Sequence, residues 1–201
     1  MEPDIVEVVS RARAGDKEAV DFVAHRALTL ALRTSAATIG SREEAADVAQ
    51  EVAIDVLRGL RSLRDPSHFD TWVYRITARR YRITARRALR FLELWRGRSR
   101  AESHLDALGE NEQPSIEIGE AALAERWSVT PAIRDALAEL PPRQRLALAL
   151  RYVADLTDSE IADVLGCRRG TACSLLSRGR SALQANPLLA DLRPSHLQGD
   201  C

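Results

Sequence analysis

The sequence has little of several residue classes, and each shortage excludes a class of protein. Its 201 residues include only three cysteines, an odd number without framework spacing, so a set of structural disulfides is not expected. Cys167 and Cys173 are separated by a spacing that matches no paired-ligand zinc site, and we expect neither a metal nor a cofactor. No apolar run approaches the roughly 18 residues of a membrane span, and the amino terminus does not resemble a signal peptide. We therefore expect a soluble cytoplasmic protein without membrane insertion.

Aromatic residues make up only 4% of the chain, and glycine is also scarce, with 10 residues. Alanine, leucine, arginine and glutamate dominate instead, which is typical of an all-α protein. The sequence also has no Ser/His/Asp or Cys/His pairing, no phosphate-binding loop and no carboxylate pair in a pocket-like context. We therefore do not expect an enzyme.

The formal net charge is zero, which by itself argues against a nucleic-acid-binding protein. The charges are strongly segregated, however. Residues 71–100 contain 10 arginines against one glutamate, whereas residues 101–139 contain 2 arginines against 9 acidic residues. Such changes of sign along the chain indicate separate functional segments.

The basic segment contains one heptad written twice, YRITARR at residues 74–80 and again at residues 81–87. Seven residues of an α-helix return to within roughly 20° of the starting direction, so the second copy falls on the faces of the first. The arginines form one continuous stripe: Arg75, Arg79, Arg82, Arg86 and Arg90. Apolar residues form a stripe beside it: Phe69, Trp72, Val73, Ile76 and Ile83. This pattern favours a helix that lies along a polyanion, and a solvated basic face is the alternative.

Helices are predicted at residues 5–14, 16–38 and 41–60, and the second and third of them begin at capping residues. A loop is expected at residues 61–67, after which Pro66 can start the next helix. One side of the helix at 41–60 carries an acid–amide–acid cluster with an aliphatic residue: Asp47, Gln50, Glu51 and Ile54. The cluster is either a docking face for a partner helix or an ordinary solvated surface.

Beyond residue 100 the composition becomes acidic and rich in Asn, Gln, Gly and Pro, which indicates a linker. From residue 131 the helical spacing of apolar residues returns, and Gly166 lies between two predicted helices at 157–165 and 169–183. Two helices joined by a short glycine-containing turn describe a helix-turn-helix, whose second helix enters the major groove. Base contacts are then expected from its first turns: Arg168, Arg169, Thr171, Ala172 and Ser174. Phosphate contacts are expected further along, from Arg178 and Arg180, unless the two helices are a purely structural pair.

These motifs occur in an order that resembles the extracytoplasmic-function (ECF) sigma factors of bacterial RNA polymerase. The resemblance rests on ADVAQEVAIDVLRGL at 46–60, on the F-x-x-W-V-Y-R-I-T-A-R-R element at 69–80, and on the LPPRQR…EIADVLG…GT pattern within 140–183. It implies an all-α fold of two small helical domains joined by an acidic linker, with a helix-turn-helix as the second domain. The corresponding boundaries are 1–92 for sigma region 2, 93–130 for the linker, 131–185 for region 4 and 186–201 for a carboxy-terminal tail.

The resemblance also implies roles for individual residues. Asp47, Gln50 and Glu51, with the neighbouring Ile54, match the element that docks on the clamp of the largest subunit of core RNA polymerase. Another set matches the helix that engages and opens the −10 promoter element: Phe69, Trp72, Tyr74, Arg75, Arg79, Arg80, Arg82, Arg86 and Arg87. The residues around Thr171 match the helix that reads the −35 element. Many family members are held inactive by an anti-sigma factor, so such a partner is expected here.

The chain departs from the family pattern at four positions. Arg80 and Thr84 stand where the family usually has Asn and Asp, and Cys173 and Leu175 stand where it commonly has basic residues. The loss of two cations predicts a weaker phosphate grip and a weaker salt dependence at the −35 element. Two alternatives to an initiation factor therefore stay open. One is a sigma-like regulatory protein that initiates poorly, and the other is a stand-alone helix-turn-helix regulator that needs no polymerase.

Overall fold

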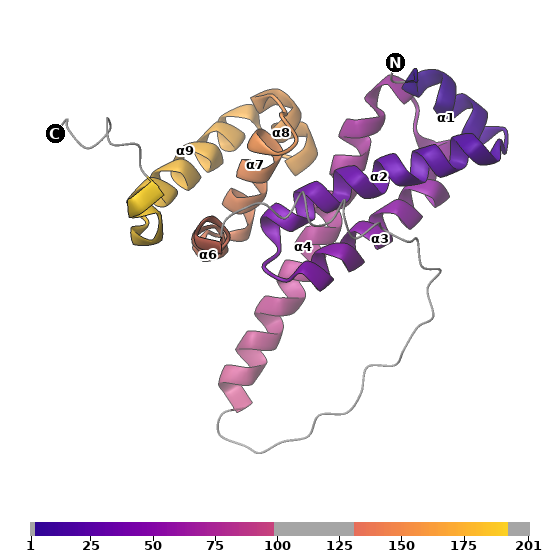
Figure 1. Cartoon of the computed structure of the whole chain (residues 1–201). Helices are drawn as coiled ribbons and strands as arrows, with labels where there is room; N and C mark the ends of the chain where they lie inside the picture. Colours follow the sequence, from indigo (N-terminus) through magenta and orange to yellow (C-terminus); the bar gives the residue numbers. More distant parts are fainter. Residues whose placement is uncertain (1–2, 99–130, 193–201) are drawn as a thin grey trace.

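The computed structural model describes residues 3–98 and 131–192, and every regular element within these ranges is helical. Two groups of helices lie beside one another, α1–α4 and α6–α9 (Figure 1). The all-α fold expected from the sequence is therefore confirmed. The acidic segment at 99–130 and the last residues, 193–201, lie outside the described ranges.

The first group comprises α1 (Ile5–Arg13), α2 (Lys17–Thr38), α3 (Arg42–Gly59) and α4 (Phe69–Arg98). Side-chain caps fix where the helices begin, because the first backbone N–H groups of a helix have no partner within it. Asp16 accepts a hydrogen bond from the N–H of Ala19, and Ser41 accepts one from Glu44. These helix starts were predicted correctly, because capping is a local signal.

The segment between α3 and α4 is more regular than the loop expected at 61–67. It contains two short 3-10 helices, η1 (Leu60–Ser62) and η2 (Pro66–His68). Asp65 caps η2 by accepting from the N–H of Ser67, and Pro66 occupies its first position. The chain then runs directly into α4, whose backbone stays helical beyond the expected boundary at residue 92.

The core of the first group forms around α2, which packs against α1, α3 and α4. Val23, Ala27 and Ala31 on α2, together with Val52 on α3 and Val73 on α4, are fully buried. At about 25 cal/mol per Å² of apolar surface, burial of this kind supplies most of the favourable free energy of folding. Small buried side chains such as Ala27 and Ala31 permit close packing of α2 on α3.

The second group comprises α6 (Pro131–Glu139), α7 (Pro142–Tyr152), α8 (Asp158–Leu165), α9 (Arg169–Ala185) and the 3-10 helix η3 (Pro187–Leu192). The capping box at the start of α8 is complete, with Thr157 and Glu160 each accepting from the other's backbone N–H. Gly166 ends α8 with φ 61°, a left-handed conformation that glycine adopts without strain. The helix-turn-helix predicted from the sequence is thus formed by α8 and α9. The start of the expected tail is η3, which packs on α6.

The two groups of helices contact each other through α4 and α8 and through α2 and α7. Arg33 on α2 donates to the carbonyl oxygen of Val153 at the end of α7, over 3.0 Å. Tyr81, the first residue of the second heptad copy, is buried, and the positive charge of Arg145 on α7 acts on its hydroxyl. The doubled heptad therefore contributes to the contact between the groups as well as to the basic stripe.

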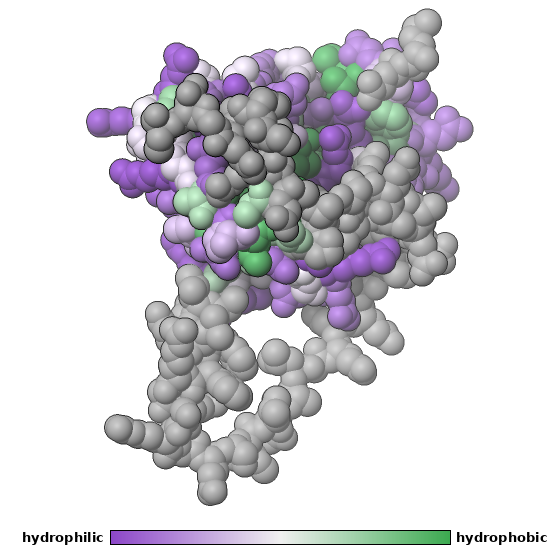
Figure 2. Space-filling view, turned by 60° about the vertical axis from the view of Figure 1, so that its left-hand side comes forward, coloured by the Kyte–Doolittle hydropathy of each residue, from purple (hydrophilic) through white to green (hydrophobic). Residues whose placement is uncertain are grey.

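The described surface seen in Figure 2 is mostly hydrophilic, with only small hydrophobic patches. Among the residues that the structure describes, no helix is long and apolar enough to cross a membrane.

Candidate nucleic-acid interface

The acidic cluster predicted on α3 occupies consecutive turns of that helix. Asp47 is exposed, and Gln50, Glu51 and Ile54 are partly exposed. We call these four residues the α3 patch. Its neighbours Val48, Val52 and Ala53 are buried, so the patch has a rigid base. A surface of this kind fits a partner helix that carries basic residues beside an apolar one.

The basic stripe of α4 lies on the surface of the same group. Arg75, Arg79, Arg82 and Arg86 of the stripe are exposed, as is Arg87 beside them, and the side chain of Arg90 lies outside the described residues. None of the five exposed arginines forms an ion pair within the described parts of the chain. Their exposure agrees with the predicted stripe, and contact with a polyanion stays a prediction.

Arg80 differs from these five arginines, although the sequence grouped it with them. Its Nε donates to Asp55 over 2.7 Å, and its Nη1 donates to Glu51 over 2.9 Å. The side chain is 33% exposed and lies between α3 and α4. The expectation that Arg80 contacts DNA is therefore not supported, because its guanidinium already has two carboxylate partners.

Three other residues predicted to contact DNA are buried. Phe69 and Ala172 are fully buried, and Tyr74 is 5% exposed. Burial raises the pKa of Tyr74, and the charge of Asp70 acts in the same direction. In this conformation the three side chains pack in the core and have no surface for a base contact. The apolar stripe already placed Phe69 with the packed residues, whereas the contact of Tyr74 with DNA was implied by the resemblance and that of Ala172 by its place in the helix-turn-helix.

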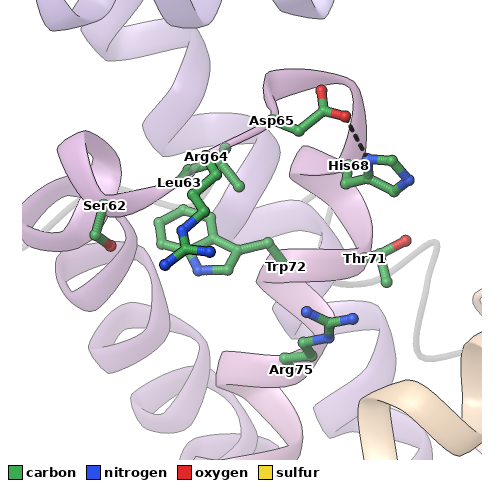
Figure 3. Close-up of a pocket in the computed structure, with 8 residues that line it drawn as sticks. All are labelled: Ser62, Leu63, Arg64, Asp65, His68, Thr71, Trp72 and Arg75. Atoms are coloured by element: carbon green, nitrogen blue, oxygen red, sulfur yellow. Dashed lines mark hydrogen bonds and ion pairs between the residues drawn. The ribbon is translucent and has the colours of Figure 1, made fainter.

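Trp72 lines a cavity of about 320 Å³ next to the start of α4 (Figure 3). Residues from the segment between α3 and α4 and from α4 itself complete the lining: Ser62, Leu63, Arg64, Asp65, His68, Thr71 and Arg75. The Phe69 ring packs against Trp72 with 6.1 Å between ring centroids, which holds the indole from the core side. An indole beside two arginines offers a stacking surface and positive charge, a combination suited to an unpaired nucleotide.

The wall of this cavity is held by contacts that the sequence did not reveal. Arg13, at the end of α1, donates to the carbonyl oxygens of Leu60 and Leu63. Asp65 accepts from Ser67 and contacts His68, and the hydrogen bonds from Ser67 lower the pKa of Asp65. The Asp65-Pro66-Ser67 turn signal could have indicated an ordered segment here. No local signal connects Arg13 to this segment, because the contact spans about 50 residues.

The second helix of the helix-turn-helix presents most of its predicted contacts. Arg168, Arg169, Thr171 and Ser174 are exposed at its start. Arg178 and Arg180 are exposed further along. The hydroxyl of Ser174 donates to the carbonyl oxygen of Gly170 over 2.8 Å, so its oxygen stays available as an acceptor. This arrangement fits base contacts from the first turns and phosphate contacts beyond them.

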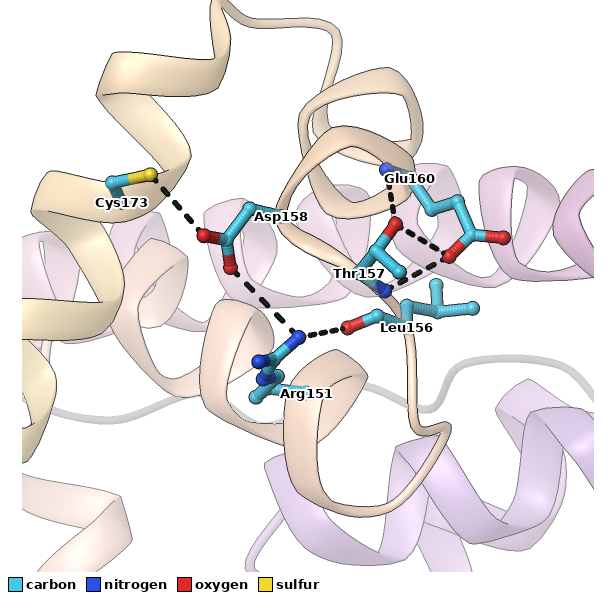
Figure 4. A network of polar contacts seen from close by, with 6 residues as sticks. All are labelled: Arg151, Leu156, Thr157, Asp158, Glu160 and Cys173. Carbon is cyan, nitrogen blue, oxygen red and sulfur yellow. Dashed lines mark hydrogen bonds and ion pairs between the residues drawn. The ribbon is translucent and has the colours of Figure 1, made fainter.

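A polar network connects this helix to α8 and α7 (Figure 4). The thiol of Cys173 donates to Asp158 over 3.4 Å, and Asp158 lies 3.9 Å from Arg151. Arg151 also donates to the carbonyl oxygen of Leu156. Next to it, hydrogen bonds from Thr157 hold the pKa of Glu160 below its usual value. Cys173 therefore connects α9 to α8 through the carboxylate of Asp158.

Two family descriptions match the chain at these sites. "Sigma-70 region 2" matches residues 23–91, and "Sigma-70, region 4" matches residues 131–183. The "RNA polymerase sigma-H factor" of Pseudomonas aeruginosa is 32% identical over 197 residues, which cover 92% of this chain and 95% of that protein. The chain belongs to the ECF sigma factors of RNA polymerase. The "ECF RNA polymerase sigma-E factor" of Escherichia coli K12 is 29% identical, and 90% of this chain and 94% of that protein are covered.

Solved structures of sigma factors share the fold of this ECF sigma factor. The sigma factor RpoE of Bartonella quintana, in complex with the anti-sigma factor NepR, gives a TM-score of 0.60 at 23% identity over 86% of this chain and 99% of that chain. CnrH in complex with the cytosolic domain of CnrY gives a TM-score of 0.56 at 19% identity, covering 94% of this chain and 99% of that chain. ECF sigma factors are regulatory initiation factors, so the function class expected from the sequence is confirmed.

Proposed function

We propose that this ECF sigma factor docks on core RNA polymerase through the α3 patch and opens promoter DNA along the exposed face of α4. The observation that carries the proposal is that one rigid helix pair holds both surfaces. Asp47 on α3 is exposed in an acidic setting, whereas Arg75, Arg79 and Arg82 on α4 are exposed and unpaired within the described residues. Opposite charges on neighbouring helices suit two different partners, the polymerase clamp and DNA.

In this proposal the cavity beside Trp72 accepts an unpaired base of the −10 element. Unstacking a base costs a few kcal/mol, which stacking on an aromatic side chain offsets by about 1–3 kcal/mol. Arg64 and Arg75 on the cavity wall attract the phosphates on either side of that base. The exposed arginines further along α4 then follow the DNA backbone. No catalytic step of the sigma factor itself is required, and the activity belongs to the cytoplasm, where core polymerase and DNA are found.

The helix-turn-helix holds the −35 duplex through α9 in the same proposal. Arg168, Arg169 and Thr171 approach base edges at the start of the helix. Arg178 and Arg180 approach phosphates. Because Cys173 and Leu175 replace cations, the phosphate contacts of α9 contribute less to the affinity for DNA. Each lost phosphate contact lowers the slope of log K against log salt by about 0.9.

Reconstitution with purified core polymerase tests the proposal. We expect start-site-specific transcripts, and we expect Asp47→Ala with Gln50→Ala to abolish core binding. Asp21→Ala, which removes an exposed carboxylate from α2, is the control and should leave core binding unchanged. Normal core binding by the double variant would contradict the docking assignment.

A sigma-like regulator that binds core polymerase but initiates poorly is the second candidate. Two observations favour it, since Arg80 and Cys173 are both held by intramolecular partners at positions where the family contacts DNA. Core binding without specific transcripts would support this candidate. Tight binding of the isolated chain to DNA without polymerase would instead favour a stand-alone regulator.

We also propose an anti-sigma partner for this chain. The support is the fold shared with two sigma factors whose solved structures contain an anti-sigma factor and the cytosolic domain of CnrY. Competition between a bound inhibitor and core polymerase, measured by displacement of a labelled sigma factor, tests this point.

A further inference from the structure

Arg80 is fixed between α3 and α4 by two carboxylates of α3. Asp55 accepts from Nε over 2.7 Å and also pairs with Nη2, while one oxygen of Glu51 accepts from Nη1 over 2.9 Å. Charge-assisted hydrogen bonds of this length are the stronger kind. Burial lowers the pKa of Arg80, but the two carboxylates more than offset this effect, and the net shift is upward. Arg80 is therefore a permanently charged connection between the two helices.

The neighbouring Arg79 shows that this connection is specific to one position. Arg79 is exposed and forms no ion pair with any residue in the described ranges, whereas Arg80 is turned toward α3. Successive helix positions differ in direction by about 100°, so Arg80 cannot share the DNA-facing stripe that Arg75, Arg79 and Arg82 form.

Glu51, one of the two partners of Arg80, belongs to the α3 patch. The contact with Arg80 uses only Oε2 of Glu51, and the side chain is still 39% exposed. Two carboxylates around one guanidinium keep a net charge of −1, so the site stays attractive to a basic partner. A glutamate side chain loses considerable rotamer freedom when a partner immobilises it, and a carboxylate that is already held loses less.

We propose that Arg80 is a positioning residue for polymerase docking, not a DNA contact. Asp55 orients Arg80, and Arg80 in turn sets the carboxylate of Glu51 in the direction that the clamp meets. This inference rests on the proposed assignment of the α3 patch to core docking. It explains why an arginine is accommodated at a position where the family usually has an asparagine, because here the side chain supports the neighbouring helix.

A double-mutant cycle on the full-length chain tests the inference, with affinity for purified core polymerase as the measurement. We expect Arg80→Ala to weaken core binding about two- to tenfold, the range that corresponds to immobilising one long side chain. Glu51→Gln should weaken it at least as much, and the double variant should be no weaker than Glu51→Gln alone. Arg80→Lys, which keeps the charge, should recover part of the loss. If Arg80 acted only through stability, Arg80→Ala would reduce the affinity for core polymerase by the same factor in the parent chain and in Glu51→Gln. This outcome would overturn the inference.

The matched control is Arg79→Ala, measured by the salt dependence of promoter binding by the reconstituted holoenzyme. Arg79→Ala should lower the slope of log K against log salt by about 0.9, whereas Arg80→Ala should leave the slope unchanged. A lower slope for Arg80→Ala would overturn the inference. If neither Asp47→Ala nor Glu51→Gln weakens core binding, the docking assignment itself fails and the inference falls with it. If both weaken core binding and Arg80→Ala does not, only the role of Arg80 is wrong.

Discussion

Arg145 on α7 donates through Nη1 to the carbonyl oxygen of Thr38, the last residue of α2, over 2.9 Å. The last carbonyls of an α-helix have no partner within it and carry partial negative charge, so a guanidinium is favourable there. This contact joins residues 107 positions apart and holds the helix-turn-helix group against the group that carries the α3 patch. Arg145 also donates to the carbonyl oxygens of Ala138 and Leu140, which places the connection between α6 and α7 at the same point.

Removing this guanidinium should separate the two groups of helices. We expect Arg145→Ala to increase the radius of gyration of the full chain in small-angle scattering and to lower the free energy of unfolding by about 1–3 kcal/mol, as for the loss of a part-buried hydrogen bond from a charged group. Arg143→Ala removes an exposed arginine from the same helix and is the control. Arg145→Ala also disturbs the connection between α6 and α7, so a second variant is needed. Arg33→Ala removes only the 3.0 Å hydrogen bond to the carbonyl oxygen of Val153. An unchanged radius for both Arg145→Ala and Arg33→Ala would contradict this role.

Tyr81 should make folding sensitive to alkaline pH. Burial raises the pKa of Tyr81, and the nearby charge of Arg145 only partly opposes this shift. Because the folded-state pKa lies above the unfolded value of about 10, this contribution to stability is complete below about pH 10 and is lost as pH rises through the folded-state pKa. Urea unfolding between about pH 9 and 11 should therefore show a smaller loss of stability in Tyr81→Phe than in the parent chain.

The control for this experiment is Tyr152→Phe, because the side chain of Tyr152 is 64% exposed. Tyr74 is also buried and has a raised pKa, so part of the alkaline loss should persist in Tyr81→Phe. Identical pH profiles for the parent chain and Tyr81→Phe would exclude Tyr81 as a source of the effect.

Trp72 should be needed for promoter opening more than for initial binding. We expect Trp72→Ala to reduce permanganate reactivity of unpaired thymines in the −10 element about tenfold, within the 1–3 kcal/mol of one lost base stack. Trp72→Phe keeps an aromatic ring at the cavity and should retain more opening. Closed-complex binding by the holoenzyme, measured at low temperature, should change little. Equal losses of binding and opening would point to a structural role of Trp72 beside Phe69.

Two glycines of α9 should respond in opposite directions to alanine. A Cβ at Gly170 would meet no atom within 4 Å, so Gly170→Ala should raise the free energy of unfolding by about 0.5–1 kcal/mol. A Cβ at Gly179 would lie 2.9 Å from Cδ1 of the buried Leu148, and this clash, at about 1–3 kcal/mol, exceeds the gain in helix propensity. Thermal unfolding of the two variants tests the pair, and stabilisation by both would show that Leu148 moves aside readily.

Local features of the fold could be predicted because their causes are close in sequence. The caps at Asp16, Ser41 and Thr157 contact backbone groups within three residues, so helix starts follow from short patterns. The turn at Gly166 follows from the one residue type that adopts its conformation without strain. The helical period also predicted the exposure of Arg75, Arg79 and Arg82, since neighbours on a helix face are set by 3.6 residues per turn.

The sequence by itself therefore determined the helices, the helix-turn-helix, the α3 patch and the family of this protein. Only the tertiary structure decided which groups Arg80 contacts, because Glu51 and Asp55 lie 29 and 25 residues away and no helical period connects them to it. The same holds for Arg13 at the cavity wall and for Tyr81 near α7. In the doubled heptad, two identical copies YRITARR meet different neighbours. Arg80 of the first copy reaches α3, whereas its counterpart Arg87 is exposed, so the contacts of each copy depend on what packs beside it.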